Sequence, residues 1–253
     1  MRIRITIAYD GRRFAGWQIQ PGKRTVQEEL NRALSELYAA PVYVTGAGRT
    51  DSGVHARGQV AHFDVASPRV PVHRLVRAAR HFLPQDIAIR AASEAASDFH
   101  ACFSTLARRY IYSYVIDEIF PFEQGIAALW PHSGRPDHAR ILEILAPLAG
   151  EHDFTSFSLK DCSAKTRVRS LQPVTVADTE RGFRLDFTAD GFLRRMIRMI
   201  LGQLEASYPH PDAALEMQRI LDARDNALCA PAASPAGLYL EEIIYPEIYA
   251  REA

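Results

Sequence analysis

The strongest candidate for chemistry is an aspartate in a glycine-rich segment, GAGRTDSG, at residues 46–53. Three glycines within eight residues predict tight turns or a close approach to another part of the backbone. The guanidinium of Arg49 can lower the pKa of the nearby Asp51 carboxylate and keep it ionised, as a nucleophile requires. The segment lacks the Gly-Lys-Ser/Thr ending of a phosphate-binding loop and the glycine spacing of a dinucleotide fingerprint. The alternative is a structural role, in which Asp51 caps its own loop as an Asx-turn.

A second candidate is a metal site on a predicted strand. His62 and Asp64 are two residues apart and would share one face of an extended strand. With a third ligand they would form the two-histidine, one-carboxylate set of non-haem iron enzymes. Such pairs also arise by chance in a chain with nine histidines, so we prefer surface strand positions for both residues. The third ligand would be one of His55, His73, His81 and His100.

Three tyrosines follow one another on a single face of a predicted strand that runs from Arg109 to Ile116. They are Tyr110, Tyr112 and Tyr114, at the period of two that a strand imposes. Such a stripe usually packs half-buried against neighbouring elements. It could instead be a platform on which a nucleic-acid base stacks.

An arginine lies near the centre of a predicted amphipathic helix. The helix is expected over residues 191–204, with Asp190 as its N-cap. Arg198 has apolar neighbours on both sides, so we expect its charge to have an anionic partner, either structural or Asp51. The core face of this helix would comprise Leu193, Ile197, Ile200, Leu201 and Leu204.

The elements that must position these residues alternate between strands and helices. Strands are predicted from Ile3 to Tyr9 and from Gln59 to Val65, and a short one at residues 42–44. A helix is predicted from Thr25, opened by a capping box, TVQE, with apolar residues at helical spacing up to Leu37 and its end set by Pro41. The order predicts an α+β fold with helices on one side of the sheet. We expect two halves, residues 1–103 with the Asp loop and residues 104–253 with the tyrosine strand and the arginine helix.

Composition indicates an ordinary globular protein, with 47% apolar residues, 24% charged residues and a net charge of zero. No apolar run approaches about 20 residues, and the N-terminus alternates like a strand, so we expect a cytoplasmic protein. Three widely spaced cysteines predict neither disulfides nor a cysteine-rich zinc site. All but three of the 30 basic residues are arginine, and several are clustered. A neutral protein can still carry one basic groove for nucleic acid.

These features together resemble the TruA-type tRNA pseudouridine synthases. The segment GRTDSGVHA at residues 48–56 resembles the family signature GRTDxGVHA, and YDGRRFAGWQIQ at residues 9–20 resembles the N-terminal YDGxxFxGWQxQ. The resemblance covers nearly the whole chain. Further motifs follow in the family's order: TVQ at 25–27, LPQDI at 83–87, FHA at 99–101, RYIY at 109–112, DFTSF at 153–157, GFL at 191–193 with Met196 and Arg198, and GLYL at 237–240.

The resemblance implies a fold with two similar halves, a mainly antiparallel sheet flanked by helices and a central active-site cleft. It implies isomerisation of uridine to pseudouridine in the anticodon arm of tRNA, roughly at positions 38 to 40, without metal or organic cofactor, by a homodimer. Asp51 would be the catalytic residue, acting as nucleophile or base at the ribose or the ring. Tyr110 and Arg198 would complete the catalytic set. Arg49 would help to extrude the base, and Leu238 would contact the substrate.

Some positions depart from the family pattern. Ser52 replaces a common Ala, Asp190 replaces a common Asn, and the segment at residues 205–210 lacks the usual Val-Gly after the helix. The last departure affects the expected helix-end or RNA contacts rather than the catalytic set. Two other functions stay open at this point. One is a catalytically silent tRNA-binding protein, whose binding would be sensitive to salt. The other is the metalloenzyme built on His62 and Asp64.

Overall fold

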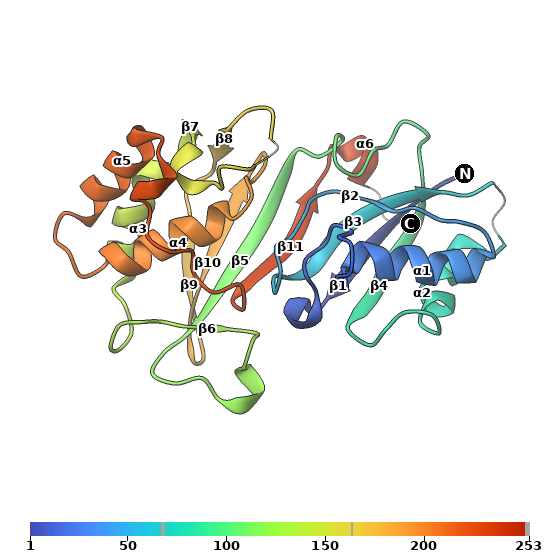
Figure 1. The fold of residues 1–253 in the computed structure, drawn as a ribbon, viewed down its shortest axis with the longest axis horizontal. Coiled ribbons are helices and arrows are strands. Elements are labelled where there is room, and N and C mark those ends of the chain that lie inside the picture. Colours follow the sequence, from blue (N-terminus) through green and yellow to red (C-terminus); the bar gives the residue numbers. More distant parts are fainter. Residues whose placement is uncertain (67–68, 163, 251–253) are drawn as a thin grey trace. The chain divides into compact units, whose positions relative to one another are not determined.

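The structure, a computed structural model, describes residues 1–66, 69–162 and 164–250. The chain forms two units, each of which contains strands and helices (Figure 1). The first unit comprises Met1–Ala107 with Tyr239–Ala253, and the second comprises Arg108–Leu238. The sequence-based division after residue 103 stays a prediction.

The first unit begins with a strand that lies between two antiparallel neighbours. Strand β1 (Arg2–Tyr9) pairs with β3 (His55–Asp64) on one side and β4 (Ile87–Ala95) on the other. Ile3, Ile5 and Ile7 alternate along β1 and are fully buried, so the alternation predicted this strand correctly. Its remaining elements are the 3-10 helix Gly11–Arg13, α1 (Val26–Tyr38), β2 (Thr45–Gly46), α2 (Val72–Ala79), β11 (Leu238–Ile244) and α6 (Glu247–Ala250).

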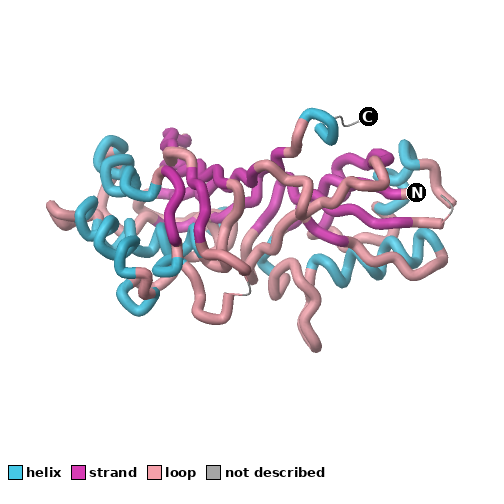
Figure 2. The backbone as a smooth tube through the Cα atoms, turned by 90° about the horizontal axis from the view of Figure 1, so that it is seen from above, coloured by secondary structure: helices cyan, strands magenta, loops and turns pink. Residues whose placement is uncertain are grey.

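Helix α1 runs along one face of this sheet (Figures 1 and 2). It begins after Thr25 as predicted, but the predicted capping box is wrong. The Thr25 side chain makes no capping hydrogen bond, and its buried hydroxyl meets no hydrogen-bond partner among the described residues. The helix ends at Tyr38 because Ala39 adopts a left-handed conformation with φ of 51°.

The short strand predicted at residues 42–44 is also wrong. Side chains of α1, rather than a neighbouring strand, satisfy this backbone. The Val42 amide donates to Ser35 Oγ at 2.9 Å, and the Val44 amide donates to Asn31 Oδ1 at 2.8 Å. The segment therefore lies extended beside the helix, and strand β2 begins only at Thr45.

The second unit is built on β5 (Ala107–Val115), which carries the tyrosine stripe. Strand β10 (Gly182–Ala189) runs antiparallel to it, with Tyr112 opposite Leu185. Figure 2 shows the helices of this unit on one face of its strands. Its remaining elements are β6 (Ala128–Leu129), α3 (His138–Leu145), β7 (Gly150–Asp153), β8 (Val168–Leu171), β9 (Thr175–Thr179), α4 (Met196–Ser207), α5 (Ala213–Ala223) and 3-10 helices at Pro121–Glu123, Ala146–Leu148, Thr155–Phe157 and Asn226–Leu228.

The predicted α+β class with a mainly antiparallel sheet flanked by helices is confirmed. Among the named strand pairs of the two units, β11 with β3 and β5 with β6 are parallel, and the others are antiparallel. The strand predicted at residues 59–65 is present, but it begins four residues earlier, at His55. Across the described ranges, no helix has the length and apolar character that crossing a membrane requires.

The start of α4 differs from the prediction. The helix begins at Met196 rather than residue 191, because Arg195 adopts a left-handed conformation with φ of 65°. Asp190 is therefore not its N-cap. The Asp190 carboxylate instead accepts a hydrogen bond from the Ser170 amide at 3.0 Å, and its carbonyl accepts one from Arg108 at 2.7 Å.

Candidate active site

Asp51 lies in the turn between β2 and β3, and the segment that follows β1 holds this turn by its backbone. The Trp17 amide donates to the Thr50 carbonyl at 3.1 Å, and the Gly53 amide donates to the Phe14 carbonyl at 3.4 Å. Buried Thr50 also shares a 2.8 Å hydrogen bond between its Oγ1 and the Tyr9 hydroxyl. These contacts fix the residues on both sides of Asp51. Asp51 itself is half-buried.

Strand β3 holds the same turn from its other end. The Ala47 amide donates to the Val60 carbonyl at 2.7 Å, and Gln59 Nε2 donates to the Gly48 carbonyl at 2.8 Å. Gln59 is completely buried. A buried amide that bonds a backbone carbonyl holds that carbonyl in one place, since leaving either group unpaired costs about 1–3 kcal/mol. The turn is therefore anchored on two sides.

Glycines make the close approach possible. Gly16 has φ of +108°, and a Cβ on it would lie 2.7 Å from the Thr50 carbonyl oxygen and 3.3 Å from the Asp51 carbonyl carbon. A Cβ on Gly11 would lie 2.1 Å from the Val54 carbonyl oxygen. No larger residue fits without moving the backbone. The glycine of the YDG motif and that of the GWQ motif therefore lie directly against the turn that carries Asp51.

His55 anchors the end of the turn. Its Nδ1 accepts the Gly11 amide at 3.2 Å and lies 3.4 Å from an Asp10 carboxylate oxygen. Its ring stacks on Tyr239 with a centroid separation of 4.5 Å, and only 2% of the residue is exposed. Sequence reasoning gave His55 a role of its own only as a possible metal ligand, although it lies within the GRTDSGVHA segment. The local signal that could have identified it is its position four residues after Asp51 at the start of a buried strand.

Two ionisable neighbours of His55 have shifted pKa values. Burial raises the pKa of Tyr239 to about 12, so its hydroxyl stays neutral. Partial burial would raise the pKa of Asp10, but hydrogen bonds from Arg12, together with the charges of Arg12 and His55, outweigh burial and lower that pKa. Arg12 is thereby engaged in a local ion pair.

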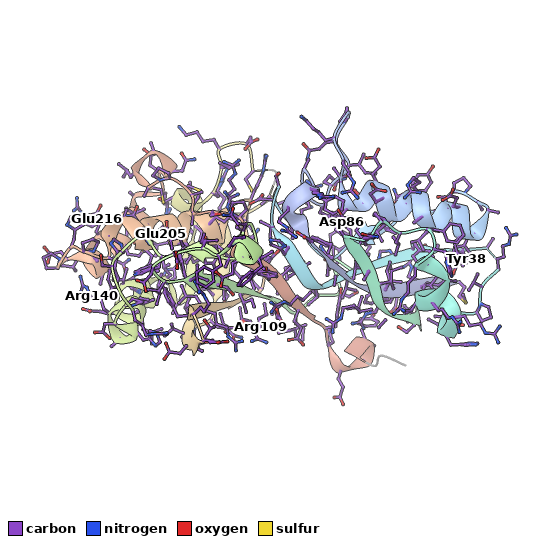
Figure 3. All side chains as sticks on the ribbon, turned by 90° about the horizontal axis from the view of Figure 1, so that it is seen from below. Tyr38, Asp86, Arg109, Arg140, Glu205 and Glu216 are labelled. Carbon is purple, nitrogen blue, oxygen red and sulfur yellow. The ribbon has the colours of Figure 1, made fainter. Side chains whose placement is uncertain are left out.

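Arg24, which follows Lys23 in the sequence, also has a structural role. Arg24 pairs with both oxygens of Asp86, at 2.7 and 2.9 Å, and with Glu29 at 2.8 Å (Figure 3 labels Asp86). Its guanidinium also lies over the Phe14 ring, 4.3 Å from the centroid. Arg24 therefore stabilises the segment around Phe14, which holds the Asp51 turn.

The tyrosine stripe lies on β5 of the second unit, and its members have different surroundings. Tyr112 and Tyr114 are 0% and 1% exposed, and each hydroxyl donates to an acceptor within this unit. Tyr110 is 6% exposed, and its ring meets Phe192 edge-on at 5.1 Å. Phe192 belongs to the predicted GFL motif. Packing accounts for the two inner tyrosines, which leaves Tyr110 as the candidate for contact with a base.

Arg198 lies in the first turns of α4 in the same unit. Its Nε donates to the Ala233 carbonyl at 2.8 Å, and the Ala233 amide donates back to the Arg198 carbonyl at 2.8 Å. This reciprocal pair orients the guanidinium at its Nε end. The anionic partner expected for Arg198 stays a prediction.

The two remaining predicted site residues differ in exposure. Arg49 is exposed on the first unit, in the same turn as Asp51. Leu238 closes the second unit and is 5% exposed, with its amide bonded to the Pro235 carbonyl at 3.0 Å. Arg49 is thus accessible to a large ligand, whereas Leu238 offers little surface.

Two residues of the segment that departs from the family pattern, Glu205 and Tyr208, have partners within the second unit. Glu205, labelled in Figure 3, accepts a hydrogen bond from the Tyr114 hydroxyl at 2.6 Å. Burial raises the pKa of its carboxyl, which the Tyr114 hydrogen bond lowers only in part. Tyr208 accepts the Asp137 amide at 2.9 Å and packs edge-on against Trp130. These two residues therefore have internal partners, whereas Ala206, Pro209 and His210 are exposed.

The alternative metal site is not supported by the surroundings of its residues. His62 Nδ1 accepts the Ala101 amide at 3.1 Å, and burial lowers its pKa to about 4. Asp64 binds Arg2 through both oxygens, at 3.0 and 2.8 Å. Within the described ranges, no three His, Cys, Asp or Glu residues are grouped so that they could hold a metal ion.

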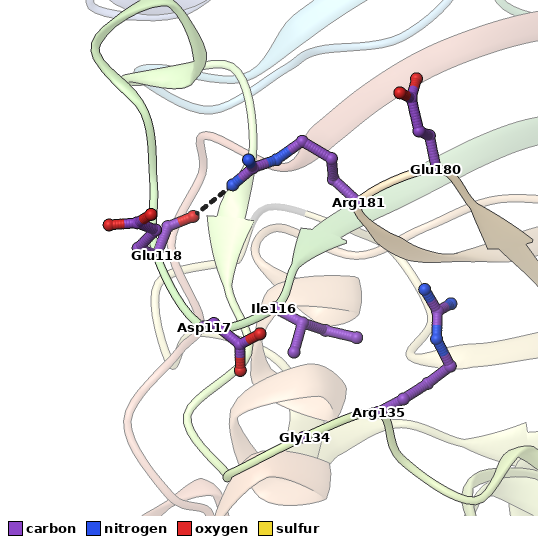
Figure 4. A pocket seen from close by; sticks show the side chains of 7 residues that line it. All are labelled: Ile116, Asp117, Glu118, Gly134, Arg135, Glu180 and Arg181. Atoms are coloured by element: carbon purple, nitrogen blue, oxygen red, sulfur yellow. Dashed lines mark hydrogen bonds between the residues drawn. The ribbon is translucent and has the colours of Figure 1, made fainter.

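A pocket of about 340 Å³ in the second unit lies apart from these candidates (Figure 4). Arg181 crosses it and donates to the Glu118 carbonyl at 2.8 Å. None of the predicted site residues lines it. The lining residues are Ile116, Asp117, Glu118, Gly134, Arg135, Glu180 and Arg181.

Comparison with known proteins identifies similar sequences over nearly the whole chain. A family model described as tRNA pseudouridine synthase matches residues 5–104 and 144–246. The tRNA pseudouridine synthase A of Chromobacterium violaceum is 41% identical over 248 residues, 98% of this chain and 94% of that protein. The protein of the same name from Maricaulis maris is 39% identical over 97% of this chain and 98% of its own length. A third, from Coxiella burnetii, is 41% identical over 97% and 93%.

Proposed function

The chain belongs to the tRNA pseudouridine synthase family, and from this premise we propose that it isomerises uridines in the anticodon stem-loop of tRNA, at positions 38 to 40, with Asp51 as nucleophile. Membership makes the chain an isomerase that acts on tRNA; the position and the residue roles are the proposal. The observation that carries it is the anchored turn around Asp51, which lies within the matched residues 5–104. We further propose a cytoplasmic homodimer.

The reaction exchanges one bond of the uracil for another. The bond between N1 and the ribose C1′ breaks, a bond between C5 and C1′ forms, the C5 proton leaves and N1 gains a proton. The base must first leave its stack, at a cost of a few kcal/mol that is smallest near a loop. Asp51 acts on the ribose or the ring to start the exchange. The rearrangement is internal, so it requires no hydride carrier or phosphate donor.

Anchoring of the Asp51 turn suits this chemistry. The detached uracil must turn and rejoin without escaping, so the attacking oxygen has to stay in one place while the base moves. Thr50 and Gly53, on either side of Asp51, are held by backbone hydrogen bonds, and the buried Tyr9 hydroxyl adds a bond to Thr50. The turn can therefore present the carboxylate in a fixed position before substrate arrives.

The proposal gives Tyr110 and Arg198 separate roles. Tyr110 would stack on the uracil and help to remove the C5 proton. The guanidinium of Arg198 would keep the Asp51 carboxylate ionised. Arg49, which is exposed, would assist extrusion of the base, and Leu238 would support the base from its own buried position.

The test is release of tritium from tRNA that carries tritium at uridine C5. Wild-type protein is expected to release it, and Asp51→Asn to lose at least about a thousandfold of the rate, as expected for loss of a nucleophile that cannot be replaced. Ser52→Ala is the matched control in the same turn, because the exposed Ser52 donates one hydrogen bond, to the Phe14 carbonyl at 3.2 Å, which the Gly53 amide still bonds after the substitution. Mapping of pseudouridine in the product tRNA identifies the positions.

Three outcomes would contradict parts of the proposal. An Asp51→Asn variant as active as Ser52→Ala would remove Asp51 from its role. Product outside positions 38 to 40 would contradict the proposed substrate position. Light scattering that reports a monomer at micromolar concentration would contradict the homodimer.

A further inference from the structure

The loop at residues 230–237, called here the α4 loop, is fastened to α4 and β5 within the second unit. Near its start, the Ala230 amide donates to Gln203 Oε1 on α4 at 2.9 Å. At its end, the Gly237 carbonyl accepts the Ser113 amide of β5 at 2.9 Å. Gln203 is 6% exposed, so its hydrogen bond is shielded from water. Both ends of the α4 loop are therefore held by buried elements.

The middle of the α4 loop holds Arg198. The Ala233 carbonyl accepts Arg198 Nε at 2.8 Å, while the Ala233 amide donates to the Arg198 carbonyl at 2.8 Å. The side chain of Arg198 is thus oriented by a backbone group that lies 35 residues away in the sequence. Any shift of the Ala233 peptide would move the direction in which the guanidinium points.

The next carbonyl along the α4 loop is fixed by a buried tyrosine. The Tyr112 hydroxyl donates to the Ser234 carbonyl at 2.8 Å, and Tyr112 itself is completely buried. Consecutive carbonyls of one extended segment therefore bond Arg198 and Tyr112. Because peptide planes are rigid, a bond to one carbonyl restrains its neighbour.

Steric contact keeps the α4 loop close to the helix. A Cβ on Gly202 would lie 1.9 Å from the Pro231 carbonyl oxygen, so only glycine allows this approach. A Cβ on Gly237 would lie 2.6 Å from the Ser113 carbonyl oxygen and 3.0 Å from the Tyr112 ring. The α4 loop therefore fits between α4 and β5 with no space to shift toward either.

We propose that Tyr112 is a positioning residue for Arg198, acting through the Ser234 and Ala233 carbonyls of the α4 loop. This inference rests on the proposed function, in which the Arg198 guanidinium serves the reaction. A shift of about 1 Å in a group of this kind can cost up to a hundredfold in rate. Tyr112 does not touch the uridine in this scheme. It sets the place of the residue that does serve the reaction.

Tyr112→Phe tests the inference, with Tyr114→Phe as its matched control. Both variants remove one phenol hydroxyl from the same buried face of β5, and each breaks one hydrogen bond. Only Tyr112 is bonded to the α4 loop. We expect kcat to fall about tenfold in Tyr112→Phe with little change in KM, and to change less than about twofold in Tyr114→Phe, at a temperature where both are folded. Equal losses in the two variants would overturn the inference.

The same substitution in an Arg198→Lys background separates positioning from a general structural effect. If Tyr112 acts through Arg198, the second substitution should add less than about a twofold loss. A further tenfold loss would show that Tyr112 acts by another route and would overturn the inference.

A measurement that does not depend on activity keeps the inference distinct from the proposed function. The Nε–H signal of Arg198, assigned by its loss in Arg198→Lys, reports on the bond to Ala233 in nuclear magnetic resonance spectra. Its hydrogen exchange is expected to be at least about tenfold faster in Tyr112→Phe and unchanged in Tyr114→Phe. Unchanged exchange in Tyr112→Phe would overturn the inference. A wild-type protein that releases no tritium would instead overturn the proposed function, while the exchange result still decides the role of Tyr112.

Discussion

The turn around Asp51 and the α4 loop around Arg198 are held in different ways. Around Asp51, backbone groups mainly bond backbone groups, with added side-chain bonds from Gln59 and Tyr9, and glycines allow the close approach. Around Arg198, a side chain bonds the backbone of the α4 loop, and Tyr112 bonds the next carbonyl. The first arrangement depends mainly on main-chain geometry, and the second mainly on two particular side chains.

This difference has consequences for what substitutions do. A change that moves the backbone at the Asp51 turn must disturb packing and stability together, since several backbone hydrogen bonds hold the turn and stay in place when one side chain is removed. In the α4 loop, removal of one hydroxyl can move a functional group at a modest cost in stability. Substitutions that move the backbone of the Asp51 turn should therefore lower the free energy of unfolding as well as the reaction rate.

Gly16→Ala should have the largest effect, because it combines two penalties. A left-handed φ of +108° is strained for alanine, and the new Cβ would lie 2.7 Å from the Thr50 carbonyl oxygen. We expect the free energy of unfolding to fall by about 3 kcal/mol and tritium release to fall more than tenfold. Urea unfolding and the tritium assay measure the two effects.

Gly22→Ala is the matched control for Gly16→Ala. Gly22 also has positive φ, at +67°, but a Cβ there would meet no atom within 4 Å. It should cost about 1 kcal/mol and leave the rate unchanged. Equal losses of stability in both variants would show that backbone strain alone matters and that the close approach to the Asp51 turn does not.

The two units should respond to pH in opposite directions. Burial, and then the nearby charges of Arg2 and His100, lower the pKa of His62 in the folded state to about 4, below its ordinary 6.5. Between these values the unfolded chain binds the extra proton, so His62 contributes stability that is lost as pH falls from 6.5 to 4. Burial raises the pKa of Glu205 above 4.5. Its contribution is present below pH 4.5 and is lost as pH rises through the folded-state pKa.

Urea unfolding between pH 4.5 and 7 tests this pair. His62 should make the wild-type protein lose stability as pH falls across this range. In His62→Gln this loss should be smaller by about 2 kcal/mol, which is less than the full pKa shift would give because solvent screens part of it. In Glu205→Gln, whose new side chain cannot ionise, the loss of stability as pH falls should be larger than in the wild type. A His62→Gln variant with the wild-type slope would assign the acid sensitivity to another group.

Local patterns predicted the elements on which these regions are built. Alternation identified β1, and the spacing of motifs identified the loop of Asp51 before any contact was known. Patterns were less able to locate element ends. The helix α4 begins late because Arg195 takes a left-handed conformation, which no propensity predicts for arginine. Residues 42–44 are apolar enough for a strand, but side chains from α1 bond their amides first.

Tertiary contacts within the site could not be predicted from spacing. Gly16 and Thr50 are far apart in the sequence, and only the fold shows that one lies against the other. The same holds for His55, whose partners Gly11 and Tyr239 come from opposite ends of the chain. Glycine in a motif signals that something approaches closely, but it does not identify the partner.

The smallest effect, and the sharpest test of side-chain support at the Asp51 turn, is expected from a single hydroxyl. Tyr9→Phe removes the 2.8 Å hydrogen bond to Thr50 and should lower the free energy of unfolding by about 1 kcal/mol. Tyr38→Phe is the matched control in the same unit, since the buried Tyr38 hydroxyl meets no hydrogen-bond partner among the described residues. It should leave stability unchanged or raise it. Because backbone bonds still hold Thr50 and Gly53, Tyr9→Phe should keep more than about half of the tritium-release rate. A tenfold loss of rate would show that a side chain positions Asp51 after all, and the contrast with Arg198 would disappear.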